Sequence, residues 1–204
     1  HLSIRRQRQM CIRDRFGYVD SGRTYVIADP REAWLLAVVR GRQWLAWRVP
    51  DDAVVLLPNV YILGAVDLKD RRRVLASPAL VEYAAGRGWF DPGAGAPFDF
   101  CRAYAARDGR PDPRQWLGQK LVTGDETPWP PAGPLPLTVK PARKLSVAAV
   151  AAVLRSTASP APLSTPATQG GAVFQLRGDM PPEIGCIYWR TSAEPATSVF
   201  TPWY

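Results

Sequence analysis

The pattern of apolar and polar residues between Thr24 and Gly64 predicts a run of β-strands separated by short turns. Short apolar stretches alternate there with clusters of Pro, Asp, Asn and Gly, the residues that tight turns favour. Strands that follow one another so closely must pair antiparallel, because a parallel crossover needs a dozen or more residues. The pattern predicts strands over 25–28, 33–39, 43–49 and 53–57.

The segment 33–39 is apolar at every position. A strand with one face in water alternates between apolar and polar residues, so an unbroken apolar strand indicates a sheet that is covered on both faces. We therefore expect further layers on each side of this sheet. If the chain lacks those layers, we expect the apolar faces of 33–39 and 53–57 to lie partly bare and to promote aggregation.

Helical signals follow the strands. Ser77 and Pro78 form a helix start, with Ser77 as the cap of the free amides and Pro78 in the first turn, and Gly86 marks the end. Ser146 likewise precedes a segment whose Val and Leu residues share one helical face. The sequence predicts helices over 78–85, 99–105, 113–121 and 147–155.

The second half of the chain is rich in proline, since most of the 21 prolines follow Pro111. The segment 123–141 predicts extended, polyproline-like chain on the surface, with an exposed Trp129. The mixture of helices and antiparallel strands predicts an α+β fold. The last predicted strands cover 172–177, 184–190 and 198–204.

The formal net charge of +8 is unevenly placed. Residues 1–15 hold five arginines and one aspartate, which is half of the net charge, and the other half is spread over the remaining chain. A charge so dispersed is typical of a solvated surface, so we expect no nucleic-acid partner. Because residues 1–15 show no apolar period, we interpret them as a non-native leader, a translated adapter read-through, with a native basic arm as the alternative.

Chain length, hydropathy and the spacing of the cysteines limit the classes of protein to which this chain can belong. A chain of 204 residues can bury a real core. No apolar run approaches the ~18 residues of a membrane-spanning helix, so we expect no membrane partner. The three cysteines are widely spaced and match no metal-ligand pattern. We therefore expect a reduced, cytoplasmic protein without a bound metal.

Histidine chemistry is excluded for most of the chain, because the only histidine is His1. Neither a Ser-His-Asp triad nor a Cys-His pair can form from the other residues, and an imidazole-ligated zinc site is excluded as well. No glycine-rich phosphate loop follows a strand, so we expect no cofactor. The neighbouring carboxylates Asp51 and Asp52 are interpreted as solvated turn residues rather than an acid–base pair.

The cysteines give one candidate nucleophile. If Met10 were removed, Cys11 would become an N-terminal cysteine whose own α-amino group can act as the base. We favour the alternative that Met10 and Cys11 belong to the non-native leader. Cys101 and Cys186 fall on apolar faces, and we expect both to be buried and unreactive.

Seven blocks of sequence carry a resemblance to a known family: TYVIADPREAWLL, VPDDAVVLLPNVYILGAVDL, LASPALVEYAAGRGWFDP, GAPFDFCRAYA, LPLTVKPARKLSV, TQGGAVFQLRGDMPPEIGCIYW and SVFTPWY. In this order they resemble successive blocks of the N-terminal-nucleophile (Ntn) cysteine dipeptidases, the family of bacterial dipeptidase A and the secernins. The resemblance covers nearly all of the chain from Gly17 to Tyr204.

The resemblance implies an αββα sandwich of antiparallel sheets and helices. It also implies hydrolysis of dipeptides by an N-terminal cysteine, through an acyl-enzyme and without a metal or cofactor. In such proteins the nucleophile lies far ahead of the strand at Tyr25, so we interpret 16–204 as the C-terminal part of a single domain that lacks its nucleophile and is inactive alone. The chain departs from the family pattern at 156–160, which leaves substrate specificity open.

Asn59 is the one site residue that the resemblance supplies. It matches the position where the wider Ntn superfamily places an asparagine, whose side-chain amide would hold the oxyanion of the tetrahedral intermediate. The alternative is that Asn59 only ends a strand after Pro58.

Two other functions remain open on the sequence. One is a related Ntn amidase, of the bile-salt or penicillin acylase type. The other is a non-enzymatic, secernin-like binding protein that uses the proline-rich segment and Trp129. The oligomeric state also stays open, a homo-oligomer included.

Overall fold

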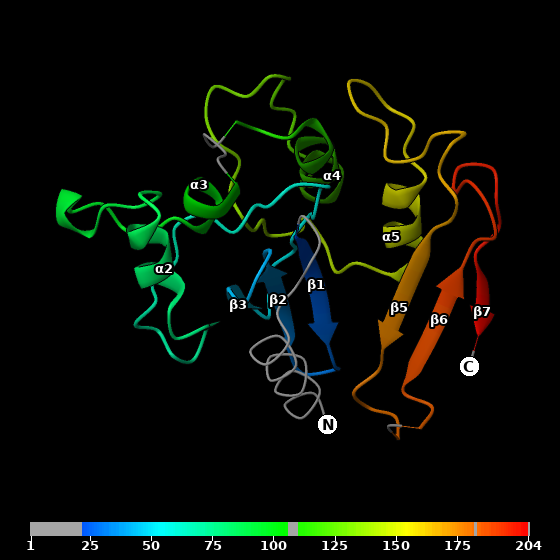
Figure 1. The fold of residues 1–204 in the computed structure, drawn as a ribbon. Helices are drawn as coiled ribbons and strands as arrows, with labels where there is room; N and C mark the ends of the chain where they lie inside the picture. The colour runs from blue at the N-terminus through cyan, green and yellow to red at the C-terminus, as the bar shows by residue number, and fades with distance from the viewer. Residues whose placement is uncertain (1–21, 106–109, 182, 204) are drawn as a thin grey trace. The chain divides into compact units, whose positions relative to one another are not determined.

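The computed structural model describes residues 22–105, 110–181 and 183–203 (Figure 1). The chain divides into two compact units. The first includes 22–51 and 57–105, and the second includes 52–56 and the chain from Pro111 onward. Helices and antiparallel strands both occur, which confirms the α+β class. Residues 1–15 lie outside the described residues, so their interpretation as a leader stays a prediction, as does a single domain over 16–204.

The first unit contains a four-stranded antiparallel sheet in the order β1-β2-β3-β4. Its first three strands confirm the prediction. At the turn between β1 and β2, the Asp29 carboxylate accepts hydrogen bonds from the backbone N–H groups of Arg31 and Glu32, at 2.7 and 3.0 Å. Gly41 permits the next reversal with a φ of 92°. The strands are β1 Arg23–Ala28, β2 Ala33–Val38, β3 Trp44–Val49 and β4 Val74–Ala76.

The predicted fourth strand, 53–57, is wrong. The edge of β3 is taken by β4, through the pairs Leu45 with Ala76 and Trp47 with Val74. Residues 52–56 belong to the second unit, where Val54 forms an isolated bridge with Val139. Leu56 lies so close to Gly118 that a Cβ there would come within 2.6 Å of the Leu56 side chain. This apolar segment packs against helix α4, Pro113–Thr123, instead of extending the sheet.

Strand β2 is the buried centre of the first sheet. Every residue from Trp34 to Val38 is buried, and successive residues of a strand face opposite sides. On one side, Trp34, Leu36 and Val38 join Trp44 and Ala46 of β3 in a single cluster. The sheet is therefore covered on both faces at β2, as the pattern predicts. The expectation that 33–39 would lie partly bare is wrong.

In the described part of the first unit, two α-helices and a 3₁₀ turn follow β4: α2 Leu80–Gly86, η1 Pro92–Ala94 and α3 Phe100–Ala105. The prediction that Ser77 caps the first helix is wrong, because α2 has no side-chain cap. The Ser77 hydroxyl instead donates to the Gln43 amide oxygen at 2.6 Å and accepts from the Trp44 backbone N–H at 3.3 Å. Ser77 thus joins the end of β4 to the start of β3.

The second unit contains two helices and an antiparallel sheet in the order β5-β6-β7. Ser146 caps α5 by accepting from the Ala149 N–H at 3.2 Å, which confirms that prediction. The described segment 124–138 has no helix or strand, in agreement with extended chain. The elements are α4 Pro113–Thr123, α5 Val147–Leu154, β5 Ala172–Leu176, β6 Cys186–Arg190 and β7 Thr201–Trp203.

Trp129 is not the exposed aromatic residue that the sequence suggested. Its ring centroid lies 5.7 Å from that of Trp116 on α4, and the side chain is partly buried. The proline-rich segment is thereby anchored to the helix, and the Trp116 indole N–H donates to the Thr127 carbonyl at 3.2 Å.

Across the described residues, no helix is long and apolar enough to cross a membrane.

Candidate functional site

A cavity of about 450 Å³ lies in the first unit, where the beginning of β1 meets the segment 57–61. Asn59, the predicted oxyanion donor, contributes to its wall and is exposed, so a ligand in the cavity can reach it. The cavity joins two segments that are far apart in the sequence. The described residues that line it are Gly22, Arg23, Thr24, Leu57, Pro58, Asn59, Val60 and Tyr61.

Tyr61 fixes one wall of this cavity. Its hydroxyl donates a hydrogen bond to the carbonyl of Val38, the last residue of β2. Its ring meets that of Phe100 edge to face, with the centroids 5.7 Å apart. Gly22 has a φ of 121°, and a Cβ at this position would overlap the Tyr61 hydroxyl. Glycine is therefore required for the close approach of these two segments.

Among the described lining residues, Arg23 carries the one formal charge, and none is acidic. Arg23 is the exposed first residue of β1. Among the described residues, its guanidinium has no ion pair and no hydrogen bond. An unpaired guanidinium keeps all five N–H donors available for a ligand.

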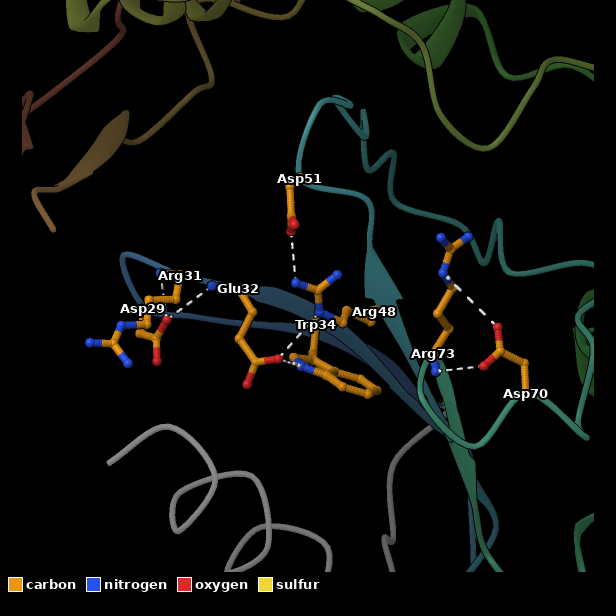
Figure 2. A network of polar contacts seen from close by, with 8 residues as sticks. All are labelled: Asp29, Arg31, Glu32, Trp34, Arg48, Asp51, Asp70 and Arg73. Carbon is orange, nitrogen blue, oxygen red and sulfur yellow. Dashed lines mark hydrogen bonds and ion pairs between the residues drawn. The ribbon is translucent and has the colours of Figure 1, made fainter.

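Arg48 shows how differently an arginine of the same sheet is used (Figure 2). Its guanidinium lies 3.3 Å from the Glu32 carboxylate and 2.7 Å from that of Asp51. The Trp34 indole N–H donates to the same Glu32 carboxylate at 3.0 Å. These groups hold the ends of β2 and β3 together and are already engaged with one another.

Other carboxylates on turns also have partners. Asp70 accepts from the Arg73 backbone N–H at 3.2 Å, and the Arg73 guanidinium lies 4.0 Å from its other oxygen (Figure 2). In the second unit, the Lys140 ammonium lies 2.8 Å from Asp52. The hydrogen bond and charge of Lys140 lower the pKa of the Asp52 carboxyl. Such contacts fit the interpretation of Asp51 and Asp52 as turn residues.

The cysteines divide into three cases. Cys101, on α3, is buried as expected. Cys186, on β6, is exposed, so the prediction of a buried thiol is wrong. Its side of β6 also carries Tyr188, two residues on, and that face of the sheet is open. Cys11 lies outside the described residues. In the described part of the chain, no group of three or more His, Cys, Asp or Glu side chains could hold a metal ion.

The sequence signalled only one residue of the cavity. Asn59 came from the family resemblance, and it is the only asparagine of the chain. Nothing in the sequence indicated a functional role for Arg23, Thr24 or Tyr61. Each lies beside an apolar run, and the pattern of such a run predicts only a strand. Their role follows only from the packing that brings 22–24 against 57–61.

Comparison with known proteins assigns the family. The model of peptidase family C69 matches residues 7–162, a span that begins within the arginine-rich segment and includes the whole cavity lining. The chain belongs to peptidase family C69. The resemblance to dipeptidase A is thus confirmed at the level of the family.

Curated relatives carry dipeptidase names. A "Probable dipeptidase" of Salmonella dublin is 32% identical over 197 residues, covering 86% of this C69 chain and 45% of the relative. A "Probable dipeptidase" of Latilactobacillus sakei is 23% identical over 199 residues, covering 87% and 41%. A "Probable dipeptidase A" of Streptococcus pyogenes serotype M1 is 25% identical over 205 residues, covering 87% and 42%. The chain spans less than half the length of these relatives.

Proposed function

We propose that this chain is part of a cysteine-type dipeptidase of the Ntn class, built as an αββα sandwich, and that its substrates are dipeptides. The proposal is supported by membership of peptidase family C69 and by the names of the relatives. The observation that carries it within this chain is the position of Asn59. The only asparagine of the sequence lines a cavity of small-molecule size.

In the proposed reaction, the thiol of an N-terminal cysteine outside this sequence gives its proton to its own α-amino group. The thiolate sulfur then attacks the peptide carbonyl carbon, and the electron pair of the carbonyl moves onto oxygen. The Asn59 side-chain N–H donates to that oxyanion. When the carbonyl re-forms, the C–N bond breaks and the leaving amine takes the proton from the α-ammonium group. Water later hydrolyses the thioester and releases the acid.

The test is a replacement of the matching segment of the Salmonella dublin dipeptidase by this chain, followed by assays of dipeptide hydrolysis. We expect turnover that a thiol alkylator abolishes. Asn59→Ala in the hybrid should lower kcat about a hundredfold with little change in KM, because the donor acts mainly in the transition state. An unchanged kcat would remove Asn59 from the mechanism.

Two controls separate the alternatives. The 204-residue chain alone should not turn over dipeptides, and turnover by it would favour the alternative that Cys11 is the nucleophile. A folded hybrid that hydrolyses bile-salt or penicillin amides but not dipeptides would indicate the related amidase. A folded hybrid that binds dipeptides without hydrolysing either class would favour the binding protein.

A further inference from the structure

We propose that Arg23 binds the free α-carboxylate of the dipeptide and so makes the cavity selective for substrates with an unblocked C-terminus. This inference rests on the proposed function for the identity of the ligand. Its basis is the donor character of the cavity, whose described lining holds a guanidinium and no acidic residue.

The polar groups of the lining suit a carboxylate. Arg23 offers a planar set of N–H donors that pairs with both oxygens of a carboxylate, and such charge-assisted bonds are stronger than neutral ones. Thr24, the next residue of β1, adds a hydroxyl, and Asn59 adds an amide. The Tyr61 hydroxyl already donates its hydrogen bond to the Val38 carbonyl. The described part of the lining thus presents a cation with neutral donors and no competing anion.

The Arg23 guanidinium is available to bind a ligand, whereas other arginines of the chain are held by contacts within the protein. Arg48 is held by two carboxylates, and Arg155 donates to the carbonyls of Pro195 and Ser198 at 3.0 and 2.9 Å. Arg23 has no such partner among the described residues. A ligand carboxylate would therefore not have to displace a protein carboxylate in order to bind.

Arg23 and Asn59 line the same cavity, so one dipeptide can contact both residues. The terminal carboxylate of a dipeptide lies one residue beyond the scissile carbonyl, about 3.5 Å along an extended chain. Asn59 would receive the scissile oxygen and Arg23 the carboxylate, while Leu57 and Val60 supply apolar surface for the side chain between them. A longer peptide has a neutral peptide group where a dipeptide has its carboxylate, so it would lose the ion pair with Arg23.

The test measures the binding of two probes to the 204-residue chain by isothermal titration: L-alanyl-L-alanine and its C-terminal amide. We expect the acid to bind at least about tenfold more tightly than the amide. Arg23→Gln should reduce the affinity for the acid to that for the amide, and Arg23→Lys should retain part of the preference. Arg42→Gln removes another exposed arginine, at the β2–β3 turn outside the cavity, and should change neither affinity.

Equal affinities for the acid and the amide, or no binding of the acid at millimolar concentration, would overturn the proposal. An equal loss in Arg42→Gln would show a general charge effect and would overturn it as well. In the hybrid dipeptidase, Arg23→Gln should raise KM about tenfold at constant kcat, whereas Asn59→Ala lowers kcat. Acid-selective binding through Arg23 in a chain whose hybrid hydrolyses nothing would refute the proposed activity while leaving the carboxylate site intact.

Discussion

The two sheets of this chain are both antiparallel and rich in aromatic and aliphatic residues, yet they are stabilised differently. In the first, Leu36 at the centre of β2 is 1% exposed. In the second, Phe174 on β5 and Trp203 on β7 are each 62% exposed. Local composition is similar in the two sheets, so it does not determine which of them forms a core.

The exposed face of the second sheet is an aromatic row. Phe174 pairs with Tyr188 and Tyr188 with Trp203 across the three strands β5, β6 and β7. The rings of Phe174 and Tyr188 stack with their centroids 4.7 Å apart. Because solvent reaches these rings, their burial contributes less to stability than that of the β2 residues.

Buried hydroxyls hold the segment that follows β6. Thr191 is fully buried; its hydroxyl donates to the Ala193 carbonyl at 2.8 Å and accepts from the Gly171 N–H at 2.7 Å. Ser164, also buried, accepts from the Ala196 N–H at 3.1 Å. In the second sheet, buried Val173 and Ile187 are thus supplemented by specific hydrogen bonds at its ends, whereas apolar packing is more extensive in the first, where every residue from Trp34 to Val38 is buried.

The largest expected effect is that of Leu36→Ala. The substitution leaves a cavity beside Trp34 and Trp44 and should lower the free energy of unfolding by about 2–5 kcal/mol. Urea denaturation followed by circular dichroism measures the change, and amide hydrogen exchange of the β2 peptide places it in the first unit. Phe174→Ala is the matched substitution in the second sheet and should cost less than about 1 kcal/mol. Equal costs would show that the aromatic row is covered in solution.

Thr191→Val should have the next largest effect. Valine keeps the shape of threonine but leaves the Gly171 N–H and the Ala193 carbonyl without their partner, which should cost about 1–3 kcal/mol. Hydrogen exchange should accelerate in β5 and β6 and stay unchanged in β2. Thr197→Val, at an exposed threonine, is the control and should be nearly neutral. If the two variants lose the same stability, the second sheet does not depend on the buried hydroxyl.

Ser77→Ala tests whether Ser77 stabilises the sheet or the helix α2. The substitution should lower the free energy of unfolding by about 1–2 kcal/mol. The hydroxyl bonds to Gln43 and Trp44, so protection from hydrogen exchange should fall in β3 and β4. If Ser77 acted as a helix cap, protection would fall first in α2. Ser146→Ala is the comparison, since that serine does cap α5, and its cost of about 1 kcal/mol should appear in that helix.

The sequence pattern succeeded where a single local signal decides the structure. Three successive strands with Asp29 in the first turn, and a helix preceded by Ser146, were predictable because their neighbours in sequence are their partners. The segment 53–57 has the same apolar pattern, but a three-residue strand from farther along the chain occupies the sheet edge. Pairing over such a separation depends on the whole packing, which local propensity does not describe.

The candidate site was predictable only in part, for the same reason. Asn59 was indicated by family resemblance, and its position in a cavity wall agrees with a functional role. Arg23 and Tyr61 became candidates only when packing placed β1 beside the segment 57–61. The exposure of Cys186 was missed because alternation tells which residues share a face, and not whether that face is covered.

The smallest expected effect concerns the ion pair of Asp52 and Lys140 in the second unit, which tests whether exposed polar contacts matter beside the buried ones. Lys140 lowers the pKa of Asp52, and Asp52 in turn raises the pKa of Lys140. The Asp52 contribution is present above its ordinary pKa and is lost as the pH falls through the lowered value. The Lys140 contribution is present below its ordinary pKa and is lost as the pH rises through the raised value.

The stabilisation by this pair should therefore be small and constant around neutral pH. Asp52→Asn should lower the urea midpoint slightly at pH 7, and the difference from wild type should shrink in acid and in ~1 M salt, because both side chains are exposed. In a Lys140→Gln background, Asp52→Asn should have no further effect. A midpoint difference that persists in that background would mean that Asp52 stabilises the turn at residues 51–52 and not the contact with Lys140. Exposed polar groups would then contribute through local chain geometry, unlike the buried hydroxyl of Thr191.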